Sequence, residues 1–172
     1  ASLEPRRNLI RLLAVSGRPK EAIAQIQTGL KYNPDNADLW FQSGLFYEEA
    51  GQIAQARNSF ETAIALDPRW PLPKESLVWL LVLQPQMNAV DARQGLGLVN
   101  EALNLYGTEV PLRVRELQAC ALAANGKFPE AIETATKTRE AFLQAKDQRG
   151  VARIEAQLAA YQSGRRWLPA QR

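Results

Sequence analysis

The chain has 172 residues, 46% of them hydrophobic and 23% charged, so it can bury a core and is not a disordered tail. A formal net charge of +3 is too small for the concentrated basic surface that binds nucleic acid. The absence of histidine and the single cysteine remove the commonest zinc ligands, the Ser-His and Cys-His catalytic pairs and any internal disulfide.

No segment reaches the roughly 20 apolar residues that a membrane-spanning helix needs. The longest apolar run, Leu77 to Leu83, is soon ended by Pro85. The lone cysteine, Cys120, lies between small apolar residues on a predicted helix, which favours a buried packing role over a nucleophile. We therefore expect no direct membrane insertion, no nucleic-acid partner, no cofactor, no metal site and no enzymatic activity.

Residues recur along the chain at an interval of 34. Pro34 and Pro68 are 34 residues apart, and Gly17 is in phase with Gly51. Ala22 and Ala56, Ile26 and Phe60, and Leu30 and Ile64 also align at this shift. Such a period indicates a stack of helix–turn–helix units rather than one irregular domain.

The clearest copy covers residues 37–70. A glycine and an alanine on its two helices permit a close crossing, and aromatic residues fill the space between the helices. Gly51 supplies the turn after the first helix, and Pro68 stops the second. In chain order the pattern is Trp40, Gly44, Tyr47, Gly51, Ala56, Phe60, Ala63 and Pro68. This pattern resembles the tetratricopeptide repeat family.

The other copies are less regular. Residues 3–36 form a degenerate first repeat. A third repeat spans 71–110, with helices at 74–84 and 91–106 and an insertion at 85–90; Asp91 is the expected N-cap of its second helix. A fourth repeat spans 111–146. A capping helix at 148–163 has Val151, Ile154, Leu158 and Tyr161 on one face.

Together these elements predict an all-α fold, a right-handed α-solenoid of about four repeat pairs plus the C-terminal capping helix. We expect one domain over residues 1–164 and a flexible basic tail over 165–172.

The last hundred residues also resemble the terminal module of a group of bacterial tetratricopeptide repeat proteins. The motifs are Leu77-Val78-Trp79-Leu80-Leu81, a loop with Pro85, the turn from Gly126 to Ala131, and a tail from Leu158 to Arg165. Some members of that group adjoin glycosyltransferase-like membrane domains. The resemblance implies a setting in the cytoplasm or in the periplasm and cell envelope, and no residue of this chain carries transferase chemistry.

In tetratricopeptide stacks the first helices line a groove that binds peptides, and the helical phase assigns residues to it. Some family members hold a C-terminal carboxylate with Lys, Asn and Arg, but here the second repeat offers acids and the third a tryptophan, so we do not expect that clamp. The residues assigned to protein or peptide binding are Arg7, Asn8 and Arg11; Phe41, Gln42, Leu45, Glu48 and Glu49; and Glu75, Trp79 and Leu83. The equivalent positions of the fourth repeat are Arg113, Glu116, Leu117 and Cys120.

The aromatic residues of this set could instead pack against neighbouring helices, because aromatic residues at helical spacing are often core. The leading hypothesis is a scaffold that binds a protein or peptide partner in the groove or at an exposed end of the stack. Self-association is a second possibility, since Leu9, Ile10, Leu12 and Leu13 leave the N-terminal end without a polar cap. The alternative function is an accessory domain that positions the acceptor protein of a larger cell-envelope protein or glycosyltransferase.

Overall fold

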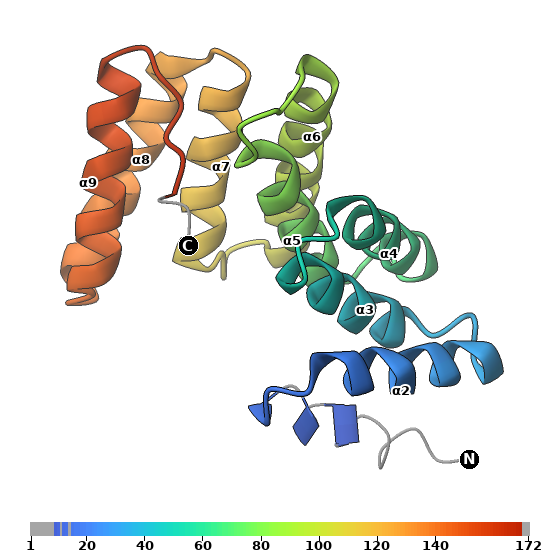
Figure 1. Ribbon diagram of the computed structural model, residues 1–172. Helices are drawn as coiled ribbons and strands as arrows, with labels where there is room; N and C mark the ends of the chain where they lie inside the picture. Colours follow the sequence, from blue (N-terminus) through green and yellow to red (C-terminus); the bar gives the residue numbers. More distant parts are fainter. Residues whose placement is uncertain (1–8, 11, 14, 170–172) are drawn as a thin grey trace. The chain divides into compact units, whose positions relative to one another are not determined.

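The computed structural model describes residues 9–169, except 11 and 14. The described part consists of helices, turns and irregular segments (Figure 1), and residues 9, 10, 12, 13 and 15 are helical. The longer helices are α2 (Pro19–Tyr32), α3 (Ala37–Glu49), α4 (Ile53–Leu66), α5 (Pro71–Val82), α6 (Ala89–Tyr106), α7 (Leu112–Ala124), α8 (Phe128–Gln144) and α9 (Gln148–Gln162).

Local sequence explains where these helices begin and end. The Asn36 side chain accepts a hydrogen bond from the Leu39 amide at 2.9 Å and caps α3. Proline lies in the first turn of α2 and of α8, where no donor is lost. Gly51 follows α3 with a φ of 70°, a left-handed conformation that a glycine adopts without a steric penalty.

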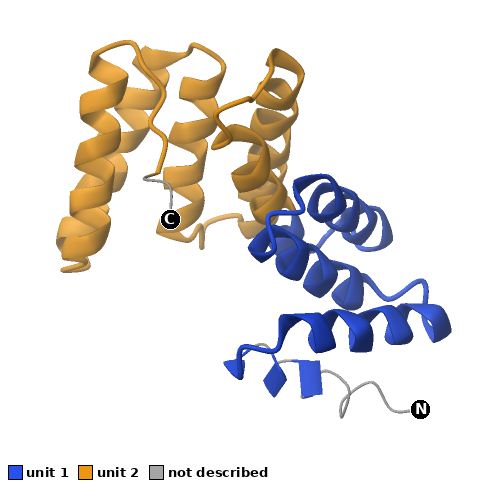
Figure 2. Cartoon of the chain, in the orientation of Figure 1, with its two compact units in different colours: residues 1–73 blue, residues 74–172 orange. Residues whose placement is uncertain are grey.

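The chain divides into two compact units, one within residues 1–73 and the other covering 74–172 (Figure 2). In unit 1, α2 packs on α3 and α3 packs on α4. Gly44 on α3 lies under the Phe60 ring of α4, where an added Cβ would come within 2.4 Å of the ring. This close crossing is the reason that the repeat needs a glycine there. The first core cluster of unit 1 comprises Ile10, Leu13, Ala22, Ile26, Leu39 and Phe46.

In unit 2, α6 packs on α7, α7 on α8, and α8 on α9, and these last three helices lie side by side in Figure 1. Gly95 lets α6 approach α5 closely, because an added Cβ would lie 2.5 Å from Cγ1 of Val82. The C-terminal core cluster comprises Ala119, Ala123, Ala131, Ala135, Phe142, Ile154, Leu158 and Tyr161.

The predicted all-α architecture of stacked helix pairs is confirmed, and so is the inward face of the capping helix, where Ile154, Leu158 and Tyr161 are buried. Two local predictions about the third repeat were wrong. Its first helix starts at Pro71 rather than residue 74, since proline suits the first turn of a helix. Asn88, not Asp91, caps α6, because the two residues form a capping box in which Asp91 is the third helical residue.

The segment expected to be a flexible tail makes contacts in its described part, residues 165–169. The Trp167 side chain packs on the C-terminal core cluster. Arg166 donates hydrogen bonds to the Val82 carbonyl at 3.4 Å and to the Met87 sulfur at 3.3 Å. These residues therefore cover part of unit 2.

Candidate protein-binding surfaces

The residues assigned to the groove from sequence fall into three groups. Arg7, Asn8 and Arg11 lie outside the described residues. The residues of α3 belong to unit 1, and Glu75 and Trp79 of α5, with Leu83 directly after it, belong to unit 2. Each group is therefore a surface of its own unit.

The α3 surface, formed by Phe41, Gln42, Leu45, Glu48 and Glu49, combines apolar and acidic side chains. Leu45 is 40% exposed, and Glu49 is exposed one turn further along the helix. Phe41 is half-buried, with its ring centroid 4.8 Å from that of Trp70 and 5.9 Å from that of Phe60. Phe41 thus packs on two aromatic rings of unit 1 and is also part of this surface.

Glu48 is the unusual member of the α3 surface. It is half-buried, and among the described residues its carboxylate has no hydrogen-bond or ion-pair partner. Desolvation by burial raises the pKa of this carboxyl group. A partly desolvated carboxylate is stabilised by a hydrogen-bond donor that reaches it.

The α5 residues are more buried than the sequence indicated. Glu75 is only 5% exposed, and it accepts hydrogen bonds from the Arg113 guanidinium at 2.8 Å and from the Tyr106 hydroxyl at 2.5 Å. Leu83 is buried, and only Trp79 is half-exposed. Glu75 therefore ties α5, α6 and α7 together instead of presenting a charge to a partner.

The fourth-repeat positions are also mostly buried, because α9 contacts this face of α7. Glu116 is 1% exposed and accepts hydrogen bonds from Arg153 at 2.7 Å and from Gln157 at 2.7 Å. Cys120 is buried as predicted and contacts the Tyr161 hydroxyl at 3.4 Å. Burial raises the pKa of the Cys120 thiol to about 12, so this thiol is not a nucleophile near neutral pH.

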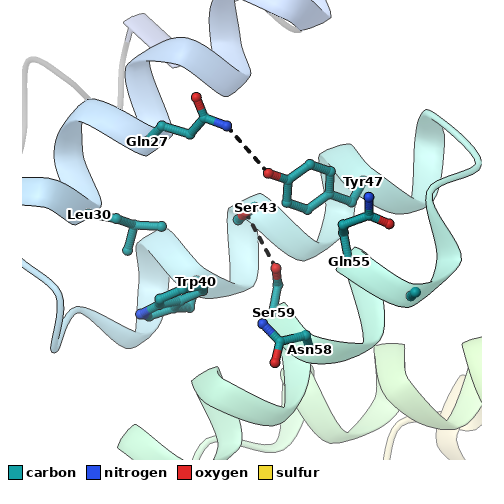
Figure 3. Close-up of a pocket in the computed structure, with 9 residues that line it drawn as sticks. Gln27, Leu30, Trp40, Ser43, Tyr47, Gln55, Asn58 and Ser59 are labelled. Carbon is teal, nitrogen blue, oxygen red and sulfur yellow. Dashed lines mark hydrogen bonds between the residues drawn. The ribbon is translucent and has the colours of Figure 1, made fainter.

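A hollow of about 430 Å³ in unit 1 was not anticipated from the sequence. It lies where α2, α3 and α4 meet, and Figure 3 shows its side chains around a contact between Ser43 and Ser59. The Gln27 amide donates to the Tyr47 hydroxyl at 3.5 Å across it. The lining residues are Gln27, Leu30, Trp40, Ser43, Tyr47, Ala54, Gln55, Asn58 and Ser59.

Small residues explain why this space is open. Ser43 on α3 faces Ser59 on α4, with 5% and 1% of each residue exposed. The Ser59 hydroxyl donates to the Ser43 hydroxyl at 3.5 Å, the long limit of a hydrogen bond. Longer apolar side chains at these positions would fill the space. The sequence signal was therefore two serines on facing helices, which a search for apolar and charged groove positions overlooks.

The described helical residues before α2 include exposed apolar side chains. Leu9 is 40% exposed, Leu12 63% and Val15 84%, whereas Ile10 and Leu13 are buried in the first core cluster. The exposed residues are three apart in sequence and so share one face of a helix.

Metal and membrane sites are not found in the part of the chain that the structure describes. None of its acidic and cysteine side chains gather in a group of three or more that could hold a metal ion. None of its helices has the length and hydropathy that crossing a membrane requires.

Comparison with known proteins places the chain among helical-repeat proteins. Residues 7–71 match the model of the tetratricopeptide repeat family, and this stretch carries the repeat residues from Trp40 to Pro68. Residues 7–71 thus carry tetratricopeptide repeats, as the sequence predicted, and the described chain has the all-α fold of stacked helix pairs. Tetratricopeptide repeats generally mediate protein–protein interaction. No curated protein matches it.

Solved structures share the fold at low sequence identity. A crystal structure of MamA is 17% identical with a TM-score of 0.74, covering 94% of this chain and 81% of that one. A MamA fragment from Desulfovibrio magneticus RS-1 is 13% identical with a TM-score of 0.68, covering 93% and 94%. TTC0263, a thermophilic tetratricopeptide repeat protein of Thermus thermophilus, is 15% identical with a TM-score of 0.64, covering 95% and 98%. At these identities the likeness concerns the fold alone.

Proposed function

We propose that the protein is an interaction scaffold and that the α3 surface of unit 1 binds a segment of another protein. The observation that carries this proposal is Glu48, a half-buried carboxylate without a partner among the described residues, beside the exposed side chain of Leu45. Two acidic residues elsewhere that are buried more deeply, Glu75 and Glu116, have guanidinium partners within the chain. Glu48 differs from them, and a lysine or arginine of a partner could donate the missing hydrogen bond to its carboxylate.

The chemistry of the surface defines the partner. Leu45 and the edge of Phe41 offer apolar contact, and Glu48 and Glu49 offer negative charge one turn away. A segment with an apolar side chain followed within one turn by lysine or arginine fits both features. Charge complementarity then sets the orientation of the segment, and apolar burial supplies most of the affinity.

The test is selection of a random peptide library against the whole chain, followed by calorimetry with the selected peptide. We expect basic-apolar peptides, and we expect Leu45→Glu to weaken binding by about tenfold or more, as loss of one apolar anchor does. The matched control is Leu105→Glu, since Leu105 on α6 is 39% exposed and should not affect binding. Failure to select peptides, or equal affinity of both variants, would count against the proposal.

Glu48→Gln separates binding from stability. Because burial disfavours the charged form of Glu48, its removal should leave the free energy of unfolding unchanged or higher. Binding of a basic peptide should nevertheless weaken. A variant that lost stability and binding together would mean that Glu48 is a structural residue.

A second candidate function is self-association through the N-terminal end, favoured by the exposed row of Leu9, Leu12 and Val15. Size-exclusion chromatography with light scattering would compare the wild type with Leu9→Glu/Leu12→Glu. A wild-type oligomer that the variant converts to a monomer would support this role. A monomeric wild type would exclude it at the concentrations tested.

The remaining alternative is an accessory domain of a larger cell-envelope protein or glycosyltransferase. In that setting the α3 surface would hold the acceptor protein. The same peptide experiment applies, with known acceptor segments in place of the library.

A further inference from the structure

The α3 surface does not account for the hollow between α2, α3 and α4 in unit 1. Its lining belongs to Trp40, Ser43 and Tyr47 on α3 and to residues of α2 and α4, none of which is among the α3 surface residues (Figure 3). Its volume of about 430 Å³ lies within the ~300–1,000 Å³ range of ligand pockets. The hollow is therefore a separate site in the same unit.

The chemistry of the lining is uncharged throughout. Its nine residues include no Asp, Glu, Lys or Arg, so nothing there would offset the cost of burying a charged ligand group. Leu30, Ala54 and the ring of Trp40 supply apolar walls. These walls suit an aromatic or aliphatic side chain and disfavour a phosphate or a carboxylate.

The deepest polar groups of the lining have spare hydrogen-bonding capacity. A hydroxyl has one donor and two acceptor positions, yet Ser43 and Ser59 share one contact of 3.5 Å. Both serines line the hollow and are more than nine-tenths buried, so little of either is in contact with bulk solvent. A ligand hydroxyl reaching this pair could donate to one oxygen and accept from the other.

The side-chain amides at the rim of the hollow can also both donate and accept hydrogen bonds. Gln55 and Asn58 are exposed, and each amide can donate and accept. They suit the main-chain amide groups that flank an inserted side chain. An aromatic side chain with a hydroxyl at its tip matches the apolar walls, the serine pair and the amide rim together.

From these observations we propose that the hollow is a second docking site, which takes a tyrosine side chain of a partner protein with its phenol hydroxyl on the Ser43–Ser59 pair. Hydrogen bonding and apolar contact are the whole of the interaction, and no covalent step is involved. The site lies apart from the α3 surface, so the two proposals can fail independently.

The test is an NMR titration of the whole chain with N-acetyltyrosinamide, N-acetylphenylalaninamide and methyl glucoside. We expect shifts of the Gln55 and Asn58 side-chain amides, and about fivefold tighter binding of the tyrosine compound than of the phenylalanine compound, the gain for one added neutral hydrogen bond. Ser59→Ala should abolish this preference while phenylalanine binding persists. Ser43→Leu should block both compounds by filling the hollow.

The controls keep the result interpretable. Leu45→Glu should leave the tyrosine titration unchanged, because Leu45 does not line the hollow. Far-UV circular dichroism and the backbone amide spectrum would show whether Ser43→Leu is folded, and Ser59→Ala tests the same point with a smaller change. The proposal is overturned by equal binding of the tyrosine and phenylalanine compounds, by the absence of shifts at the hollow, or by tighter binding of the glucoside, which would indicate a sugar site.

Discussion

Two glycines on α6 provide a direct test of how closely α5 and α6 pack. Gly95 and Gly97 are both interior helical residues, so replacing either with alanine should gain about 1 kcal/mol of helix propensity. They differ in their surroundings. An added Cβ at Gly97 meets nothing within 4 Å, whereas at Gly95 it would lie 2.5 Å from Cγ1 of Val82.

The contact at Gly95 cannot relax cheaply. Val82 is 1% exposed, and its branched side chain has little rotational freedom at χ1. Carbon atoms pack at about 3.5–4.0 Å, so the helices must separate by about 1 Å or the valine must leave its rotamer. Such overpacking costs about 1–3 kcal/mol. Gly95→Ala should therefore be less stable than the wild type by up to about 2 kcal/mol, and Gly97→Ala more stable by about 1 kcal/mol.

The assay is urea denaturation, followed by far-UV circular dichroism and by tryptophan fluorescence, since a chain with two compact units need not unfold in one step. The difference between the two variants isolates the contact, because the propensity gain is common to both. Val82→Ala removes the opposing methyl groups, so Gly95→Ala should cost much less in that background. Equal stability of Gly95→Ala and Gly97→Ala would refute the packing argument.

Three further predictions concern polar groups of unit 2. Glu116→Ala should destabilise the chain by about 2–4 kcal/mol, because it leaves the buried Gln157 amide and the Arg153 guanidinium without their acceptor. Adding Arg153→Ala to that variant should reduce the stability little further. A negligible change in the free energy of unfolding on urea denaturation would contradict this prediction. The Cys120 thiol, with a pKa raised to about 12 by burial, should react with iodoacetamide only after unfolding, and native labelling at neutral pH by mass spectrometry would show that the site opens. Desolvation is the largest cause, and the hydrogen bond to Glu75 the next, of a rise in the pKa of Tyr106 from 10.0 to about 12. The protonated Tyr106 hydroxyl therefore contributes stability that is present below about pH 10 and is lost as the pH rises towards 12. Glu75→Gln should lower that pKa in an absorbance titration, and an unchanged titration would show that Glu75 has no part in the shift.

The repeat period and its small and aromatic residues were sufficient to predict the fold. Gly51 and Pro68 mark the ends of helices by backbone conformation alone, and Gly44 marks a crossing that admits no side chain. These constraints are local or lie within one helix pair, so one sequence reveals them. The capping of α6 was missed because Asn88 and Asp91 are both good cap residues, and only geometry decides between them.

The candidate site was harder to predict, because helical phase tells which face a residue occupies but not what covers that face. On α3 the phase led to exposed or half-buried side chains, including Leu45 and Glu48. On α5 and α7 the same phase led to Glu75 and Glu116, which are buried by contacts with residues about 30 to 40 positions away. Pairings at that distance leave no periodic signal in one sequence. The hollow at Ser43 was missed because it results from the small volume of two facing serine side chains, and not from the presence of a group that helical phase would reveal.

The contacts between α9 and α7 have a consequence for assembly. Gln157 and Arg153 donate hydrogen bonds to Glu116, and the Tyr161 hydroxyl contacts the Cys120 sulfur. The side chains of α9 thus bind the buried polar groups of α7. A second copy of the chain carries the same helix and could supply every one of these contacts. Exchange of α9 between two molecules would then keep these contacts, and the turn at Lys146, with its φ of 57°, would have to open and lose its own backbone hydrogen bonds.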